Sequence, residues 1–162
     1  MSAVKLELEF AKAEDAVELA ELCVLAMRPS LEKIGRFDAE RARQRLLGNF
    51  VAEYTRLIKL DGLLAGFLVQ RPQEDDLLLD HFYLHPDFQQ RGLGSAAMKL
   101  VLAKADALGK IIHVGVLRDS DANRFYLRHG FVLREVAEFD NYYLRYPQSD
   151  KQSRQHRPGL AN

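Results

Sequence analysis

A glutamine and two glycines at the spacing Gln-x-x-Gly-x-Gly form the feature of this chain with the clearest chemical meaning. Gln89, Gly92 and Gly94 stand between a run of alternating apolar residues and a long amphipathic stretch. The pattern predicts a turn that joins a strand to the first turn of a helix. That turn leaves backbone N–H groups unpaired and carries about half a positive charge, and glycine lets a ligand approach the amides closely. The segment is therefore a candidate site for an anion, in particular a phosphate.

Two other phosphate-binding motifs fit this segment poorly. A dinucleotide-binding fingerprint needs a third glycine and an acidic residue about 20 positions later, and the chain has no obvious residue for either role. A Walker loop needs Gly-Lys-Ser or Gly-Lys-Thr, which does not follow here. A tight strand-to-helix turn that binds nothing is the competing interpretation.

The stretch 79–108 resembles the central motif of the GNAT superfamily of N-acetyltransferases, which use acetyl-CoA as the acetyl donor. The resemblance implies that backbone amides beside the glycines hold the diphosphate of CoA. It also implies that the end of the preceding strand pairs with the pantetheine arm. The matching residues are Gln89, Gln90, Arg91, Gly92, Leu93, Gly94 and Ser95 for the diphosphate, and Phe82, Tyr83 and Leu84 for pantetheine.

A second stretch, LRDSDANRFYLRHGF, resembles another block of the same family. Tyr126 has the position at which the family's tyrosine donates a proton to the departing CoA thiolate; a tyrosine that only packs is the alternative. The asparagine that the family often carries six or seven residues earlier is replaced by Asp119 and Ser120. Asn123 is then a candidate contact of pantetheine, with a place on the helix surface as the alternative.

An amine acceptor has to lose a proton before it attacks a thioester. With a pKa near 10.4, its free base lies about 4.6 kcal/mol uphill at neutral pH. Asp80 and His81 precede the predicted pantetheine contacts, and the period of a strand predicts that their side chains point to opposite faces. Asp80 is the preferred base, because the family often carries a carboxylate on this strand, and His81, His113 and Glu138 are the alternatives. For each of them, a solvated or structurally paired side chain is the competing interpretation.

Other kinds of catalytic site have little support in the sequence. The five histidines lack paired cysteines and a helical His-x-x-x-His spacing, so no metal is predicted. Cys23 lies in an apolar helical stripe and Ser95 belongs to the glycine segment, and neither stands in a nucleophile motif. The prediction is direct attack of the amine in a ternary complex.

The composition limits the partners and the compartment. Lys plus Arg and Asp plus Glu each number 23 among the 162 residues, so no net charge draws the chain to nucleic acid or to an anionic membrane. One cysteine, no signal-peptide pattern and no apolar run of about 18 residues favour a cytoplasmic protein. We expect neither a nucleic-acid partner nor a membrane partner.

The periodicity predicts one α/β domain over residues 1–147, followed by a disordered tail at 148–162. Strands are expected at 4–10, 54–60, 63–71, 77–84, 111–117, 131–138 and 141–146, and helices at 14–27, 38–48, 92–108 and 121–129. In the third helix, Leu93, Ala97, Leu100 and Leu108 are expected to face inward. The order of elements is similar to the GNAT fold, which implies a mixed, mainly antiparallel sheet that is splayed at its centre and flanked by helices.

These observations predict an N-acetyltransferase that moves the acetyl group of acetyl-CoA to a primary amine. A noncatalytic acyl-CoA-binding or sensing domain of the same fold is the alternative. The acceptor, a small-molecule or peptide amine or a protein lysine, is expected to meet residues 27–36 and 138–143, where Glu32, Glu138 and Asp140 attract a cation. A homodimer through the last two strands is common among similar proteins.

Overall fold

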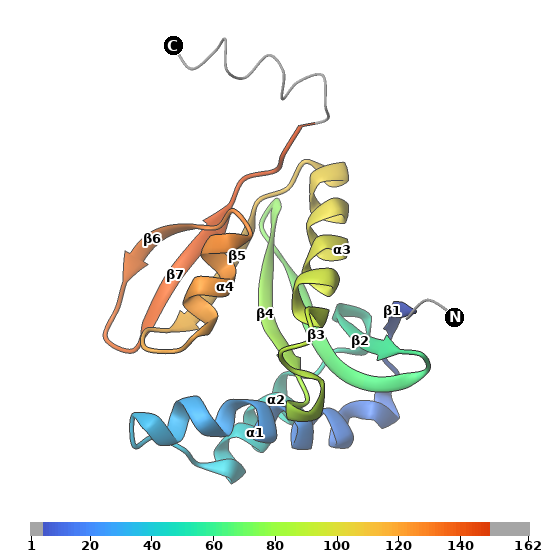
Figure 1. Cartoon of the computed structure of the whole chain (residues 1–162), viewed down its shortest axis with the longest axis vertical. Coiled ribbons are helices and arrows are strands. Elements are labelled where there is room, and N and C mark those ends of the chain that lie inside the picture. The colour runs from blue at the N-terminus through green and yellow to red at the C-terminus, as the bar shows by residue number, and fades with distance from the viewer. Residues whose placement is uncertain (1–4, 150–162) are drawn as a thin grey trace.

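Seven strands form one mixed sheet in the computed structural model, which describes residues 5–149. Their order across the sheet is β1-β2-β3-β4-β5-β7-β6 (Figure 1). The strands are β1 (Leu6–Phe10), β2 (Thr55–Leu60), β3 (Leu63–Gln73), β4 (Asp76–Leu84), β5 (Ile112–Leu117), β6 (Val132–Val136) and β7 (Asp140–Arg145). The helices are α1 (Ala16–Lys33), α2 (Ala39–Asn49), α3 (Leu93–Leu108) and α4 (Ala122–Arg128), with short 3₁₀ turns at Ala13–Asp15, Ala52–Tyr54 and Pro86–Phe88.

The order of elements predicted from periodicity is confirmed, and most boundaries differ by one or two residues. The first helix is the main exception, because it was expected to end at residue 27 and instead continues through Pro29 to Lys33. Asp38 caps α2 as predicted, since its carboxylate accepts from the Arg41 N–H at 3.1 Å. The expectation that Gly48 ends this helix is wrong, because Asn49 still belongs to it.

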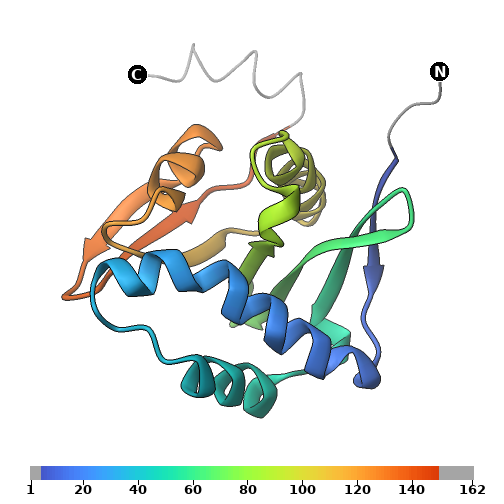
Figure 2. The ribbon, with the colours of Figure 1, turned by 60° about the horizontal axis from the view of Figure 1, so that its bottom comes forward.

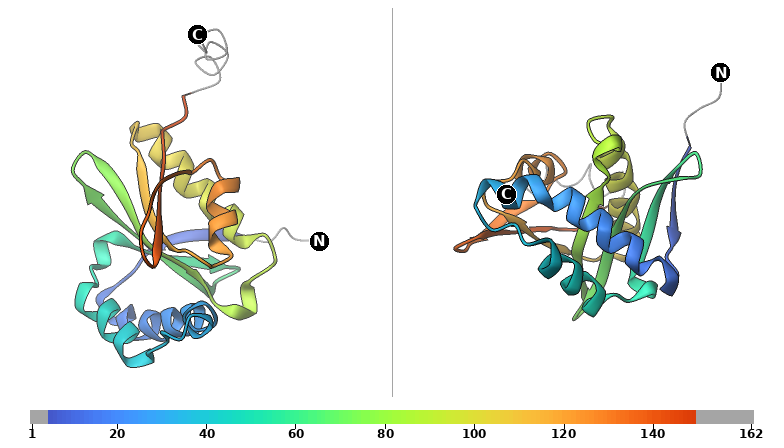
Figure 3. Two further views of the ribbon diagram at one scale, coloured as in Figure 1. Left: turned by 90° about the vertical axis from the view of Figure 1, so that its left-hand side faces the viewer. Right: turned by 90° about the horizontal axis from the view of Figure 1, so that it is seen from below.

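Helices cover both faces of the sheet (Figures 2 and 3). The α1 and α2 helices pack on one face, where Leu19 and Cys23 meet Phe67 and Val69 of β3. The α3 and α4 helices pack on the other face, over residues such as Leu68 of β3 and Leu79 of β4. Alternation of side chains along each strand therefore builds two apolar layers from one sheet.

The expected inward face of the third helix is partly wrong. Leu93 and Ala97 are buried, but Leu100 and Leu108 are 46% and 53% exposed. Their places in the core are taken by other apolar residues of α3, namely Met98, Val101, Leu102 and Ala105. The apolar stripe of α3 is wider than one face, so periodicity alone did not define which side packs on the sheet.

The sheet opens at its centre, between β4 and β5. These two strands are parallel and pair only from Leu77 to Leu79 on β4, opposite Ile112 to Val114 on β5. Beyond Leu79 the strand β4 stays paired with β3 as far as Leu84, while β5 continues along β7. The predicted splay is therefore present, and residues 80–84, called the open segment of β4 below, lack a strand on the β5 side.

A buried ion pair ties the far end of α3 to the last strand. Arg145 of β7 is 6% exposed, and its guanidinium donates to both carboxylate oxygens of Asp106, at 2.8 and 3.3 Å. The backbone N–H of Gln148 donates to the same carboxylate, so residue 148 is still attached to the fold. The predicted tail otherwise lies outside the described residues from 150 onward. No helix within residues 5–149 is both long and apolar enough to cross a membrane.

Candidate active site

The glycine turn, residues 89–95, leads from β4 into α3 as the sequence predicts. Gln90 and Gly92 both have left-handed backbone angles, with φ of 63° and 78°. The first backbone bond of the helix runs from the Ala96 N–H to the Gly92 carbonyl, at 3.1 Å. Within the described residues, the N–H groups of Leu93, Gly94 and Ser95 therefore have no intrahelical partner. Their free donors and the helix dipole favour an anion at this point.

The two glycines serve this turn in different ways. Gly92 has φ of +78° and open space where a Cβ would stand, so glycine relieves backbone strain there. Gly94 has no such φ, and a Cβ on it would meet the Phe125 ring at 3.5 Å and the Leu84 side chain at 3.6 Å. These are ordinary van der Waals distances, so the start of α3 lies next to both β4 and α4, but an alanine would also fit at position 94.

The open segment of β4 presents backbone groups beside this turn. The His85 N–H donates to the Ala65 carbonyl of β3 at 2.8 Å. Because backbone groups alternate sides along an antiparallel strand, those of Phe82 and Leu84 point away from β3. The Leu84 carbonyl accepts from the Gln89 side-chain amide at 3.0 Å, so Gln89 closes the glycine turn against the strand. Leu84 and the glycine turn are therefore in contact, and the Phe82 backbone faces the same open side of β4.

Gly66 of β3 lets the neighbouring strand approach the open segment of β4 closely. A Cβ at this position would overlap the Tyr83 backbone oxygen and come within 2.9 Å of the Leu84 side chain. The two strands can approach this closely only with glycine here. Sequence reasoning missed this residue, because a glycine within a strand pattern does not by itself reveal which backbone it faces.

Tyr126 lies on α4 with its ring buried and its hydroxyl free. The side chain is 6% exposed and packs edge-on against Phe125 and Phe131, with ring centroids 5.3 and 5.2 Å away. In the described part of the chain the hydroxyl has no hydrogen-bond partner, and it is not among the fully buried unpaired oxygens, so it keeps contact with solvent. Burial raises the pKa of Tyr126 above its ordinary value, which keeps the phenol protonated.

Asn123, one turn before Tyr126, is engaged inside the protein. Its amide nitrogen donates to the carbonyls of Leu117, Arg118 and Ser120, at 2.8 to 3.0 Å. Its oxygen accepts from the Tyr143 hydroxyl at 2.7 Å and from the Asn141 amide at 2.9 Å. These bonds hold α4 against β5 and β7. A contact with pantetheine would therefore have to replace one of them.

The expectation that Asp80 and His81 point to opposite faces is wrong. A bulge interrupts the β3–β4 register, so that Val69 pairs with His81 and Gln70 with Leu79. Asp80 is the extra residue, and its carboxylate lies 3.8 Å from the His81 Nε2. The bulge breaks the alternation on which the expectation rested.

Both side chains lie within a larger polar group on this strand. The Asp80 carboxylate accepts from the Arg71 guanidinium at 2.9 Å, and the Nδ1 of His81 is 3.3 Å from the Tyr83 hydroxyl. Burial lowers the pKa of His81, while the nearby Asp80 opposes that effect. Burial also raises the pKa of Tyr83 and brings the pKa of the Cys23 thiol to about 11, which leaves that thiol a weak nucleophile.

His113, a weaker base candidate, lies at the closed end of the β4–β5 junction. It pairs with Leu78 in the register, and its Nε2 is 3.5 Å from the Asp76 carboxylate. The structure therefore separates His113 from the open segment, which begins beyond Leu79.

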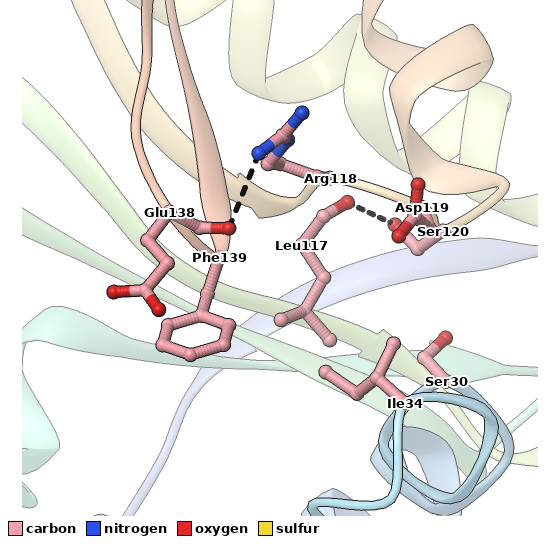
Figure 4. A pocket seen from close by; sticks show the side chains of 8 residues that line it. All are labelled: Ser30, Ile34, Leu117, Arg118, Asp119, Ser120, Glu138 and Phe139. Carbon is pink, nitrogen blue, oxygen red and sulfur yellow. Dashed lines mark hydrogen bonds between the residues drawn. The ribbon is translucent and has the colours of Figure 1, made fainter.

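A cavity of about 250 Å³ lies between the end of α1, the end of β5 and the β6–β7 turn (Figure 4). Its apolar lining consists of Ile34, Leu117 and Phe139, and its polar lining of Ser30, Arg118, Asp119, Ser120 and Glu138. Arg118 points away from the apolar group and donates to the Glu138 carbonyl at 3.3 Å. Of the three predicted acidic acceptor contacts, only Glu138 lines this cavity. Glu32 instead accepts from Arg28 at 2.9 Å.

The turns on either side of this cavity touch each other. The Arg36 guanidinium, just after α1, stacks over the Phe139 ring with 3.9 Å to the centroid. A cation–π contact of this kind links the α1–α2 connection to the β6–β7 turn. These are the two regions that the sequence assigned to the acceptor.

One comparison identifies the family of this chain, and another identifies solved structures that share its fold. A family model described as an acetyltransferase (GNAT) domain matches residues 48–133. A PaiA N-acetyltransferase from Thermoplasma acidophilum, solved with coenzyme A, is similar with a TM-score of 0.73 and 16% identity, over 88% of this chain and 99% of that one. An acetyltransferase from Thermus thermophilus is similar with a TM-score of 0.71 and 23% identity, over 90% of this chain and 99% of that one. The ribosomal-protein-S18-alanine N-acetyltransferase from Escherichia coli is similar with a TM-score of 0.70 and 14% identity, over 91% of this chain and 97% of that one. No curated protein sequence matches the chain.

Proposed function

Because the chain belongs to the GNAT family of acetyltransferases, we propose that it moves the acetyl group of acetyl-CoA to a primary amine by direct attack in a ternary complex. The observation that carries this proposal is the position of the open segment of β4 beside the free amides of the glycine turn. A diphosphate and an extended amide-containing arm are the two parts of CoA that such a pair of features suits. The relative solved with coenzyme A supports the choice of donor.

The glycine turn would hold the diphosphate through the N–H groups of Gly92, Leu93, Gly94 and Ser95, with Gln90 and Arg91 beside them. Arg91 is exposed, and its guanidinium lies 5.3 Å from the Phe88 ring centroid. The backbone groups of Phe82 and Leu84, which point away from β3, would pair with the pantetheine amides. Tyr83, between them, has its backbone groups on the β3 side, so it would contact pantetheine only through its neighbours. The Leu84 N–H, which points away from β3, would donate to the developing oxyanion.

Tyr126 would act as the general acid. Its hydroxyl has no competing partner among the described residues and stays protonated because burial raises its pKa. It can therefore donate a hydrogen bond or a proton to the leaving thiolate throughout the physiological pH range. Asn123, one turn away, stays a proposed pantetheine contact that would exchange one of its internal bonds.

Asp80 would accept the proton of the amine, directly or through a water. The bulge places it next to His81, so the two side chains can share this task. The Arg71 guanidinium occupies part of the Asp80 carboxylate, which leaves the other lone pairs for a proton. Glu138, in the cavity at the β6–β7 turn, is the alternative base.

The acceptor would be a primary amine joined to an apolar group. Ile34, Leu117 and Phe139 would pack against the apolar part, and the Glu138 carboxylate would attract the ammonium group. Small amines and the N-terminus of a peptide both have this chemistry.

Binding of acetyl-CoA to two matched glycine variants tests the proposal. Gly92 and Gly109 stand at opposite ends of α3, both have φ near +70°, and neither has an atom within 4 Å of an added Cβ. Gly92→Ala and Gly109→Ala should each lose about 1 kcal/mol of stability to the same backbone strain. Only Gly92→Ala should weaken binding of acetyl-CoA, as measured by calorimetry. Equal binding by both variants would show that the glycine turn does not bind the diphosphate.

A panel of primary amines, assayed by release of the free CoA thiol, tests the reaction. Transfer to any of these amines supports the enzyme. Binding of acetyl-CoA without transfer to any of them favours the noncatalytic acyl-CoA-binding domain. Absence of binding would leave the glycines as a turn and overturn both functions.

A further inference from the structure

The histidine that follows α4 contacts the glycine turn through its side chain. His129 follows the last residue of α4, and its Nε2 is 3.0 Å from the Ser95 hydroxyl in the first turn of α3. Its ring packs against Phe125, with centroids 4.7 Å apart, so its orientation is fixed from the other side. His129 is thus the side chain that links the predicted diphosphate site to the helix that carries Tyr126.

The Ser95–His129 bond allows two arrangements of hydrogen. With Nε2 unprotonated, the hydroxyl donates to the imidazole and has no hydrogen left for a ligand. With Nε2 protonated, the imidazole donates to the hydroxyl oxygen, and the hydroxyl hydrogen is free to bind an anion at the start of α3. A hydrogen on Nε2 therefore decides whether Ser95 can serve as a donor. The neutral Nε2–H tautomer supplies that hydrogen without charge, and the imidazolium supplies it together with a positive charge that attracts an anion.

We propose that His129 is a positioning residue that takes up a proton when the diphosphate of CoA binds and thereby turns the Ser95 hydroxyl toward it. This inference rests on the proposed function, because it needs a diphosphate at the glycine turn. The negative charge of the ligand favours the imidazolium, and the imidazolium favours the Ser95 orientation that binds the ligand. Each of the two events stabilises the other.

The charges around His129 make it responsive to an anion. Partial burial lowers the pKa of His129, and three cations lower it further: Arg128 on its own helix, Lys99 on α3 and Arg145 on β7. Of these, Arg145 is paired with Asp106. In the free protein, His129 is therefore mainly neutral at neutral pH. An arriving diphosphate offsets these cations and raises the pKa of His129 in the complex.

The sign of the linkage follows from this order of pKa values. Above the pKa of the complex, the affinity for the diphosphate should not depend on pH. Between the raised pKa of the complex and the lowered pKa of the free protein, affinity should increase as pH falls, by at most about tenfold per pH unit. Below the pKa of the free protein it should level off.

The test is calorimetric binding of dephospho-CoA between roughly pH 5.5 and 7.5. This probe lacks the 3′-phosphate, which titrates in the same range, and its diphosphate stays ionised throughout. The parent should bind about fivefold to tenfold more tightly at the low end of the range than at the high end. Titrations in buffers with different ionisation enthalpies should show net proton uptake on binding.

Two variants separate a titrating role from a structural one. His129→Gln keeps a donor to Ser95 and does not titrate, so it should lose the pH dependence and bind no more weakly than the parent does at high pH. His129→Phe keeps the ring contact with Phe125 and lacks both nitrogens, so it should also lose the pH dependence and bind more weakly than the parent does at low pH. His85→Gln, beside the glycine turn, is the matched control and should keep the pH dependence of the parent.

Each outcome has a defined meaning. Proton uptake that disappears in both His129 variants supports the inference. A parent that binds without proton uptake, a His129→Gln variant with the parental pH profile, or loss of the profile in His85→Gln would overturn it while leaving the proposed function in place. A parent that does not bind dephospho-CoA or acetyl-CoA would overturn the proposed function and the inference together.

Discussion

Replacing Tyr126 by phenylalanine should separate the chemistry of this residue from its packing. The change removes one hydroxyl that has no partner in the described structure and keeps the ring between Phe125 and Phe131. We therefore expect the free energy of unfolding to change by less than about 1 kcal/mol. The effect should fall on the rate instead.

The size of the rate effect follows from the acidity of the hydroxyl. Burial puts the pKa of Tyr126 above its ordinary value near 10, while a free thiol has a pKa near 8.5, so complete proton transfer to the thiolate costs more than about 2 kcal/mol. The phenol should then act mainly as a hydrogen-bond donor to a charged sulfur. Such bonds contribute about 1.5 to 3 kcal/mol, so kcat should fall by about 10- to 150-fold. KM for acetyl-CoA should stay nearly constant.

The assay is steady-state release of the free thiol with a saturating amine, repeated as the pH is raised. Higher pH should not rescue Tyr126→Phe, because the missing group is a donor rather than a base. Tyr143→Phe is the matched control: it loses a hydroxyl that donates to Asn123 at 2.7 Å, so it should lose about 1 kcal/mol of stability and keep most of its kcat. If Tyr126→Phe turned over at the parental rate while the chemical step was limiting, Tyr126 would be a packing residue.

Three further changes test other parts of the site. Asp80→Asn should depress transfer strongly at neutral pH and much less at high pH, where the amine loses its proton unaided; an equal loss at all pH values in the rate assay would indicate a structural role. Gly66→Ala should cost about 1 to 3 kcal/mol in chemical denaturation, because the added Cβ overlaps the β4 backbone, whereas Gly48→Ala in the interior of α2, with nothing within 4 Å, should stabilise by up to about 1 kcal/mol. Asn123→Ala should lower stability by about 2 to 3 kcal/mol, because it leaves Tyr143 and Asn141 without their acceptor. If folded Asn123→Ala binds acetyl-CoA more weakly in calorimetry, the predicted contact of Asn123 with pantetheine is supported. An unchanged Kd would indicate that Asn123 has a structural role only.

The features that the sequence predicted well are those encoded locally. The glycine turn, the Asp38 cap and the order of strands and helices each depend on residues within a few positions of one another. The position of Tyr126 came from family resemblance, and its unpartnered hydroxyl became visible only in the structure.

The features that sequence reasoning missed depend on contacts between distant segments. The bulge at Asp80 is set by pairing with β3, so a strict period of two assigned its side chain to the wrong face. The first helix was expected to end at residue 27, but α1, whose Leu19 and Cys23 pack against β3, continues through Pro29 to Lys33. The hydrogen bonds of Asn123 reach β7, 20 residues away along the chain, and no local sequence pattern predicts them.

The open segment of β4 also bears on how this protein avoids aggregation. An unpaired strand edge invites a strand of another molecule, and the two outer edges of the sheet carry charges against this, with Glu7 and Glu9 on β1 and Arg134 and Glu135 on β6. The last three residues of the open segment, Phe82, Tyr83 and Leu84, carry none. Their protection comes from position, because this edge lies in the middle of the sheet with α3 and α4 packed over its face. A ligand that pairs with the open segment would occupy its free backbone groups. Such a ligand would therefore also lower the tendency of this strand to pair with another molecule.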